Sequence, residues 1–591
     1  MKLYPQITPI ILGLLCSYSI TFGQTPAQDK LKREMIRHAL EEKMGEPGKE
    51  NDKYERGSRG TTIYDERVSA NPVNVGEREI SVCYDPADSN HIVLSYMESD
   101  TSGFRFPIFY SNDAGSTWTR SNFDTKVIRN VDFPDRGVEG FGDPAFAWDK
   151  NGTVYFAWIY IEYPLGRPPA DSIYWTTNWA YSTDNGHTWL LKPNHFIAEG
   201  LVHTNNTVYN YKDGMLDREW FAVDNSGGPH QGNLYSSFTL YPKDNTNAFT
   251  GVRTKVAGVD TFGPVVKAIN SSSNFANVEV DKNGVVHVSA VNYTTFKINH
   301  TKSTDAGITF STPVVVGNAG NVNHYSNHVV HRRESPAVNM ATDGMAGSGD
   351  HVHIVWSDFP AGTVKSYYAH SDDGGITWSP QLNLNTLMAG NITLMPTVAA
   401  NGNNVSISFT SVDGNDSANY YQINSTDNGT TFSSPTKISS ASCNYHAIGA
   451  ASATSPLSFG DYNRSVRSLC NVYATWEDCR DGQSSKVYFS KTNYCTEGVR
   501  EINRINGTAQ LLEMCPNPTS DKVTLKIQSI AQEMSIAIMD MTGHEAVRKT
   551  FHLQAGTNEE TVSVAGLAKG VYVLSLNDGE GVIVTRTLVV R

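Results

Sequence analysis

The sequence predicts an all-β protein: a β-propeller, with seven blades favoured and six possible, followed by a small β-sandwich. Three observations support this fold. Glycine and aromatic residues are abundant, with 48 Gly, 28 Tyr, 23 Phe and 10 Trp, a composition typical of strands and tight turns. Residues 61–495 repeat one eight-residue motif five times and one strand–turn–strand pattern seven times. Residues 510–591 change to several short alternating strands.

The N-terminus is expected to direct export. Residues 1–23 read as a signal peptide, in which Lys2 precedes an apolar stretch too short to span a membrane. Residues 24–60 follow as a charged region, with a short amphipathic helix and then a linker. No other stretch reaches transmembrane length, so we predict no transmembrane segment. Export permits disulfides, and the pairing stays open among Cys83, Cys443, Cys470, Cys479, Cys495 and Cys515.

The strand–turn–strand pattern defines the blades. Two of its seven copies are DPAFAWDKNGTVYFAWIYIE and ANVEVDKNGVVHVSAVNY. The central Asp-x-Asn-Gly supplies the left-handed positions that a hairpin needs. Two strands here and two around the eight-residue motif give four strands per unit, as in a propeller blade. The segment TTIYDERVS near residue 61 is expected to add an outer strand to the last blade and close the ring.

The eight-residue motif follows the pattern Ser-x-Asp-x-Gly-x-Thr-Trp/Phe, as in SNDAGSTW at 111–118. Its copies centre on Asp113, Asp184, Asp305, Asp373 and Asp427. Five active sites in one chain are unexpected, because one binding pocket needs only one set of catalytic residues. Each copy also has too few carboxylates to form a calcium-binding loop. The Ser and Asp side chains can accept backbone N–H bonds, and the Gly allows a left-handed backbone. We therefore predict a structural turn whose last aromatic residue packs between blades, and no metal.

The motif resembles the Asp-box, or bacterial neuraminidase repeat, of the sialidase-like propeller superfamily. That resemblance implies that each box lies between the third and fourth strands of a blade, remote from the ligand. After a linker at 496–509, residues 510–591 resemble the type A sorting domain of the type IX secretion system, on CPNP, MDMTGHEAV, LAKGVYVLSL and TRTLVVR. This second resemblance implies passage through both membranes, the secretion machinery as a partner, and a secreted or cell-surface protein.

Charged residues gather where the innermost strands begin, at the mouth where a propeller binds its ligand. The resemblance to sialidases implies an exported glycan-cleaving enzyme in which three arginines clamp a carboxylate, a Tyr–Glu pair acts as nucleophile and helper, and an Asp is the acid/base. On this basis we assign substrate binding to Arg78, Arg218, Arg333 and Arg464. Catalysis is assigned to Asp143, Asp217, Glu219 and Tyr462. No cofactor is implied, and the net charge of −13 argues against nucleic acid as a partner.

Alternatives to a sialidase stay open. The chain lacks the Arg-Ile-Pro signature of sialidases, and its seven units exceed their six blades. The substrate can therefore be a sialylated or another anionic glycan. The same scaffold also suits a polysaccharide lyase, with Tyr445 and His446 as the base pair, or a non-catalytic surface propeller that binds glycans or proteins. Convergence of the four arginines on one cavity would favour the sialidase.

Overall fold

The computed structural model of the chain describes most of residues 63–591. The described ranges are 63–100, 103–124, 136–164, 172–192, 196–203, 215–242, 248–270, 273–319, 337–358, 363–444, 459–494, 509–530, 532–540, 545–578 and 581–591. The expected signal peptide, the charged region, most of the linker, Arg333, Tyr445 and His446 lie outside these ranges. Strands make up nearly all of the regular structure described, beside one short 3-10 helix, η2 (Leu384–Met388).

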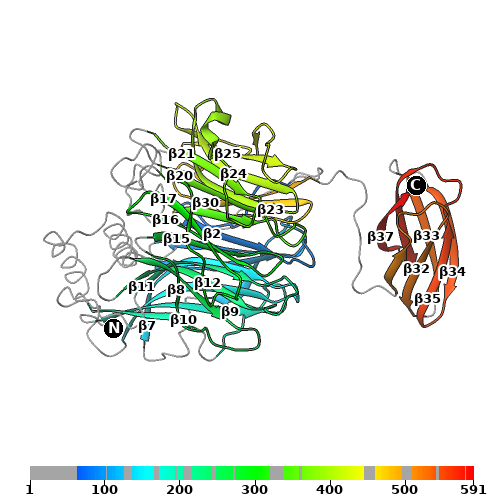
Figure 1. Ribbon diagram of the computed structural model, residues 1–591, viewed down its shortest axis with the longest axis horizontal. Helices are drawn as coiled ribbons and strands as arrows, with labels where there is room; N and C mark the ends of the chain where they lie inside the picture. Colours follow the sequence, from blue (N-terminus) through cyan, green and yellow to red (C-terminus); the bar gives the residue numbers. More distant parts are fainter. Residues whose placement is uncertain are drawn as a thin grey trace. The chain divides into compact units, whose positions relative to one another are not determined.

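The described strands of the first unit form seven antiparallel sheets, the blades (Figure 1). Blade 1 holds β2 (Gly76–Tyr84), β3 (Ile92–Asp100), β5 (Pro107–Ser111) and β6 (Thr119–Asp124), with β4 (Gly103–Arg105) beside β3. Blade 2 holds β7 (Arg136–Trp148), β8 (Val154–Pro164), β9 (Ser172–Ser182) and β10 (Phe196–His203). Blade 3 holds β11 (Met215–Val223), β12 (Leu234–Tyr241), β13 (Phe249–Lys255) and β14 (Val266–Ile269).

Blades 4 to 7 repeat this meander. Blade 4 holds β15 (Ser273–Val280), β16 (Val286–Asn292), β17 (Lys297–Ser303) and β18 (Val314–Asn318). Blade 5 holds β19 (Val338–Thr342), β20 (Val352–Asp358), β21 (Lys365–Ser371) and β22 (Leu382–Asn383). Blade 6 holds β23 (Ile392–Asn401), β24 (Asn404–Val412), β25 (Ser417–Ser425), β26 (Thr436–Lys437) and β27 (Cys443–Asn444). Blade 7 holds β28 (Ser465–Arg467), β29 (Asn471–Asp478), β30 (Lys486–Asn493) and β1 (Ile63–Arg67).

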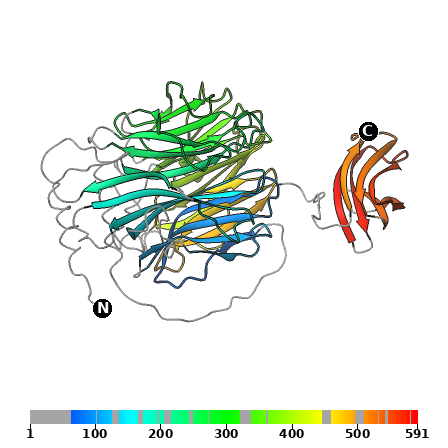
Figure 2. The same ribbon diagram turned by 90° about the horizontal axis from the view of Figure 1, so that it is seen from below.

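The blades form a closed ring. The first strands of successive blades contact one another in the cycle β2, β7, β11, β15, β19, β23, β28 and back to β2. The N-terminal strand β1 pairs with β30, with Ile63 opposite Lys491 and Arg67 opposite Tyr488. Figure 2 shows the consequence, since the blue strands from the start of the propeller lie beside the yellow strands from its end. The predicted seven-bladed propeller and its closing outer strand are therefore confirmed.

Each Asp-box lies between the third and fourth strands of its blade and holds its own turn. In the first box, Thr117 donates to Asp113 through its backbone N at 2.8 Å and its hydroxyl at 2.7 Å, and the Ser111 hydroxyl donates at 2.8 Å. Ala114 and Gly115 take consecutive left-handed conformations, as in a type I′ turn. Burial alone would raise the pKa of Asp113, but these hydrogen bonds outweigh it and lower the pKa.

The boxes also join neighbouring blades. A Cβ added at Gly115 would overlap Phe489 of blade 7, and one added at Gly429 would overlap Tyr368 of blade 5. Phe432, which ends the last box, packs edge-on against the same Tyr368 with ring centres 5.1 Å apart. The glycine and the final aromatic residue of the motif therefore serve packing against the preceding blade, as expected for a structural turn.

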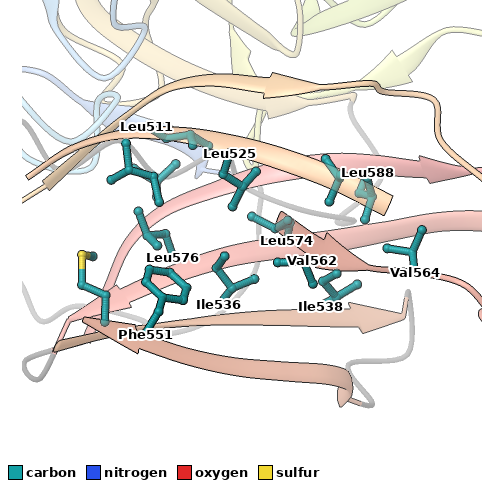
Figure 3. Packing of buried hydrophobic residues seen from close by; sticks show 14 of the residues in the cluster. Leu511, Leu525, Ile536, Ile538, Phe551, Val562, Val564, Leu574, Leu576 and Leu588 are labelled. Atoms are coloured by element: carbon teal, nitrogen blue, oxygen red, sulfur yellow. The ribbon is translucent and has the colours of Figure 1, made fainter. Parts of the chain in front are cut away.

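The second unit starts after the chain divides between Asn493 and Tyr494, and it is a β-sandwich. One sheet has the order β31 (Ala509–Cys515), β32 (Lys522–Ser529), β35 (Gly556–Ser563). The other has the order β34 (Glu545–Leu553), β33 (Gln532–Asp540), β36 (Gly570–Asp578), β37 (Gly581–Val590). Figure 3 shows side chains from both sheets, including Leu525 and Leu574, packed in the apolar layer between them.

Candidate functional site

The innermost strands of five blades share one backbone irregularity close to where they begin. In each, the register with the next strand shifts and a residue other than glycine takes a left-handed conformation with φ between 49° and 56°. These left-handed residues are Glu79, Asp143, Arg218, Phe275 and Met395. Such β-bulges re-aim side chains and cost about 1 kcal/mol or more each, so they persist where the surroundings hold them. This end of the ring, which we call the mouth, is opposite the Asp-box end.

A cavity lies at the mouth and is walled by five blades. Blade 3 contributes Arg218, Glu219 and Trp220, and blade 7 contributes Asp461 and Tyr462. The rest of the described lining comes from Phe275, Ala276, Asn277, Ala337, Val338, Asn339, Met395, Pro396 and Asn463. It offers about 20 Å³ to the centre of a water-sized sphere, which is space for one or two water molecules.

Arg218 crosses the channel to blade 7. Its guanidinium lies 2.7 Å from Asp461 Oδ2, and both side chains are almost fully buried. The same guanidinium lies 3.5 Å from Asp217 and 4.0 Å from the centre of the Phe275 ring. A buried arginine with two carboxylates and an aromatic face is fixed in place, because moving it would leave a charge without a counter-ion.

Tyr462 and Asp143 form a second contact across the channel. The Tyr462 hydroxyl donates to Asp143 Oδ1 at 3.1 Å, and the Arg218 backbone N donates to Asp143 Oδ2 at 3.2 Å. Burial raises the pKa of Asp143, partly offset by the charge of Arg218 and by hydrogen bonding with the Asp217 side chain. Burial, followed by the charge of Asp143, raises the pKa of Tyr462 well above its ordinary value. The tyrosine therefore stays protonated at neutral pH, and the Asp143 side chain that accepts its hydrogen bond is in place to receive its proton.

Glu219 is the carboxyl group at this site whose oxygens accept no hydrogen bond from any other described residue. The residue is 3% exposed, and both of its side-chain oxygens are buried. Burial, and next the negative charge of Asp143, raises the pKa of Glu219 well above its ordinary value. A carboxyl group in such surroundings keeps its proton to a higher pH than an exposed one and can donate it to a bound molecule.

The remaining assigned arginines do not meet at this cavity. Arg464 lies 3.2 Å from Glu279 of blade 4 and 4.1 Å from the centre of the Trp220 ring, and it is not part of the lining. Arg78 is fully buried in β2 and is not part of the lining. Arg333 lies outside the described residues. Among the described residues that the sequence assigned to the site, Arg218, Glu219 and Tyr462 line the cavity. Asp143 and Asp217 are not part of the lining but contact Tyr462 and Arg218.

The sequence did not identify the apolar part of the wall. Trp220, Phe275 and Met395 lie on innermost strands, where an apolar residue reads as core. Their position in the strand could have identified them. Phe275 and Met395 are the left-handed bulge residues of their own strands, and Trp220 lies two residues after the bulge residue Arg218. Asp461, the partner of Arg218, was noticeable only as a charge next to Tyr462.

Within the described part of the chain, no group of three or more His, Cys, Asp or Glu residues is arranged to hold a metal ion. The described residues also contain no helix with the length and apolar character to cross a membrane.

Family models match both units. Residues 513–591 match the secretion system C-terminal sorting domain, and residues 369–380 match the BNR/Asp-box repeat. The chain is an Asp-box propeller with a type IX sorting domain. The sorting domain marks this Asp-box propeller for export to the cell surface or beyond it. No curated protein sequence matches the chain.

Solved structures to which the chain is similar include a sialidase, an arabinanase and a polysaccharide lyase. The Hadza microbial sialidase Hz136 shares 15% identity at a TM-score of 0.37, and the alignment covers 56% of this propeller chain and 63% of the sialidase. The α-L-arabinanase of Penicillium chrysogenum shares 13% identity at a TM-score of 0.37, covering 73% and 99%. The polysaccharide lyase Uly1 shares 10% identity at a TM-score of 0.38, covering 69% and 90%. The number of blades follows from the strand order described above. The activity has to be inferred from the residues of the candidate site, because these structural similarities do not define it.

Proposed function

We propose that the protein is an exported glycoside hydrolase that cleaves glycans at the mouth of the propeller. In this scheme Glu219 donates a proton to the leaving glycosidic oxygen. Asp143 accepts the proton of Tyr462 as the tyrosine oxygen attacks the anomeric carbon, and water later releases the sugar. The described aromatic residues of the wall, Trp220 and Phe275, supply apolar faces on which a sugar ring can pack.

The observation that carries this proposal is the contrast between Glu219 and its neighbours. Asp461 and Asp217 face Arg218, and Asp143 accepts hydrogen bonds from Tyr462 and from a backbone N–H. Glu219 lines the same cavity, yet its carboxyl oxygens have no such partner within the described structure. Burying an unpartnered carboxyl group costs stability, so its retention here is explained by a task in which it gives up a proton.

The charges around the cavity bear on the substrate class. A sialylated or uronic glycan would bring its carboxylate to Arg218, where it would compete with Asp461 at 2.7 Å. A neutral glycan requires no such exchange, because a hydroxyl group can accept the Glu219 proton without displacing an ion pair. We therefore propose neutral glycans as the first substrates to test, with sialylated and uronic glycans as the second and third sets.

The experiment is a turnover screen of the full exported chain against these three sets, run beside Glu219→Gln. The wild type is expected to release reducing sugar from one set, and Glu219→Gln is expected to lose about 10²- to 10⁴-fold in kcat/KM. Glu279→Gln is the matched control: it removes a carboxylate in the same channel that already has a partner, Arg464, and should retain most activity. Equal losses in both variants would contradict the role of Glu219.

A non-catalytic glycan binder is the second candidate, favoured by the small free volume of the cavity in the described structure. Binding of a glycan set without turnover, and with affinity unchanged in Glu219→Gln, would favour it. A lyase would instead release products with a new double bond, which absorb in the ultraviolet, and that result would overturn hydrolysis.

A further inference from the structure

Two cysteines lie together where blade 6 meets blade 7. Cys443 is in β27 at the edge of blade 6, and Cys479 directly follows β29 of blade 7. Both side chains are buried, at 7% and 0% exposed, in one apolar cluster that also contains Phe459. The Cys479 thiol lies 3.3 Å from the backbone oxygen of Asn444, the residue after Cys443, and it also hydrogen-bonds the Cys443 thiol. Both are free thiols in the structure.

We propose that Cys443 and Cys479 are joined by a disulfide in the exported protein. Export takes the chain into a compartment where disulfides form and persist. Cys470, also in blade 7, is disulfide-bonded in the structure, so this blade already contains a cysteine that requires an oxidising compartment. Two thiols in hydrogen-bonding contact, held by strands of adjacent blades, need little movement to bond.

The chemistry of the step is thiol–disulfide exchange. The thiolate of one cysteine attacks the disulfide of an extracytoplasmic thiol oxidoreductase, and the resulting mixed disulfide is displaced by the second cysteine. The two cysteines lose two protons and two electrons in total, and the oxidoreductase leaves as a dithiol. The exchange must precede burial, because in the folded protein the hydrogen bond with Cys443, and next burial, raises the pKa of the Cys479 thiol and keeps it unreactive.

The bond would close a covalent loop around one side of the candidate site. The chain from Cys443 to Cys479 carries Phe459, which packs in the same cluster, and then Asp461 and Tyr462, which line the cavity. A disulfide that joins both ends of this segment restricts the conformations of the unfolded chain. In the folded protein it limits the movement of the residues that blade 7 contributes to the cavity. The disulfide is thus a positioning device for residues that reach across the channel.

Peptide mapping of the full-length exported protein tests the proposal. The protein is denatured without reductant, alkylated, digested and analysed by mass spectrometry. The expected result is one cross-linked species holding Cys443 and Cys479 that reductant separates, with Cys83 alkylated as an internal control for free thiols. Alkylation of Cys443 and Cys479 while Cys470 stays protected would overturn the proposal, as would a cross-link from either cysteine to a different partner.

Stability provides a second readout. The double variant Cys443→Ser, Cys479→Ser is expected to melt roughly 3–6 °C below the wild type, because the tether on the unfolded chain is lost. Cys83→Ser, which removes a thiol outside this pair, is the matched control and should melt close to the wild type. Cys443→Ser alone should make Cys479 open to alkylation after denaturation. Identical melting of the double variant and the wild type under non-reducing conditions would contradict the tether.

Discussion

The two ends of the blades use acidic residues in opposite ways. At the Asp-box end, five aspartates repeat in sequence, accept several local hydrogen bonds and remain ionised, with the pKa of Asp305 and of Asp373 lowered to about 2. At the mouth, the carboxyl groups of Asp143 and Glu219 are buried, and their pKa values are raised. What repeats at the mouth is the backbone bulge, while the side chain at the bulge differs from blade to blade.

This difference separates scaffold from site. A turn that must form five times needs the same side chains five times, so selection for structure shows as a repeated motif. A single pocket needs unlike groups brought together once, so the ring supplies one geometry and each blade supplies a different side chain. Substitutions at the box end should therefore affect stability and leave activity unchanged, whereas substitutions of unpaired groups at the mouth should reduce activity.

The largest expected effect concerns a paired group at the mouth. Arg218→Met removes the counter-ion of Asp461 and leaves a buried charge, so we expect a loss of about 3–5 kcal/mol in the free energy of unfolding. Urea-induced unfolding measures it. Lys192→Met is the control, because the Lys192–Asp260 pair has a similar distance of 2.9 Å but is exposed, and it should cost about 0–1 kcal/mol. Similar losses in both would show that burial does not distinguish the pairs.

The next effect concerns a box glycine. Gly429→Ala adds a Cβ that overlaps the Tyr368 hydroxyl of the preceding blade, at a residue with φ of 78°, and should cost about 2–4 kcal/mol. Gly152→Ala shares the left-handed strain, with φ of 89°, but its Cβ would meet open space, so it should cost about 1 kcal/mol. Unfolding midpoints compare the two. A difference close to zero would contradict the role of the box glycine in packing the blades together.

A smaller effect is expected at a box aspartate. Asp113→Ala removes the acceptor for Ser111 and Thr117 in a partly exposed turn, so a loss of about 1 kcal/mol is expected. Turnover of the substrate found in the screen should be unchanged, because the box lies at the end of the blade away from the mouth. A loss of turnover without a loss of stability would reverse the distinction between scaffold and site.

The pH dependence of stability separates the two ends as well. The box aspartates have lowered pKa values, so their stabilising contribution is present above the ordinary value of 3.8 and is lost as the pH falls toward about 2. Glu219 has a raised pKa, so its contribution is present below the ordinary value of 4.5 and is lost as the pH rises through the raised value. Melting temperatures across pH should show Glu219→Gln becoming more stable than the wild type as the pH rises, and Asp373→Asn losing part of the acid-side decline.

The sequence predicted the ring, the boxes and the closing strand because each depends on local patterns: hairpin glycines, alternation and the repeated Ser-x-Asp-x-Gly. It also marked Arg218, Glu219 and Tyr462, since charge at the start of an inner strand is conspicuous. It could not pair Tyr462 with Asp143 or Arg218 with Asp461, because those contacts join blades that are not neighbours in the ring. The sequence also did not identify Trp220 and Phe275 as part of the cavity wall. Their place there depends on a backbone bulge, and no residue type predicts such a bulge.

Glu219 is expected to be protonated at neutral pH, ready to donate, while the box aspartates are ionised. Infrared difference spectroscopy of the wild type minus Glu219→Gln tests it without any substrate. We expect a protonated carboxylic acid band near neutral pH that disappears only as the solution becomes more alkaline, and no such band in the difference between wild type and Asp373→Asn. An ionised carboxylate band from Glu219 near neutral pH would contradict its role as a proton donor.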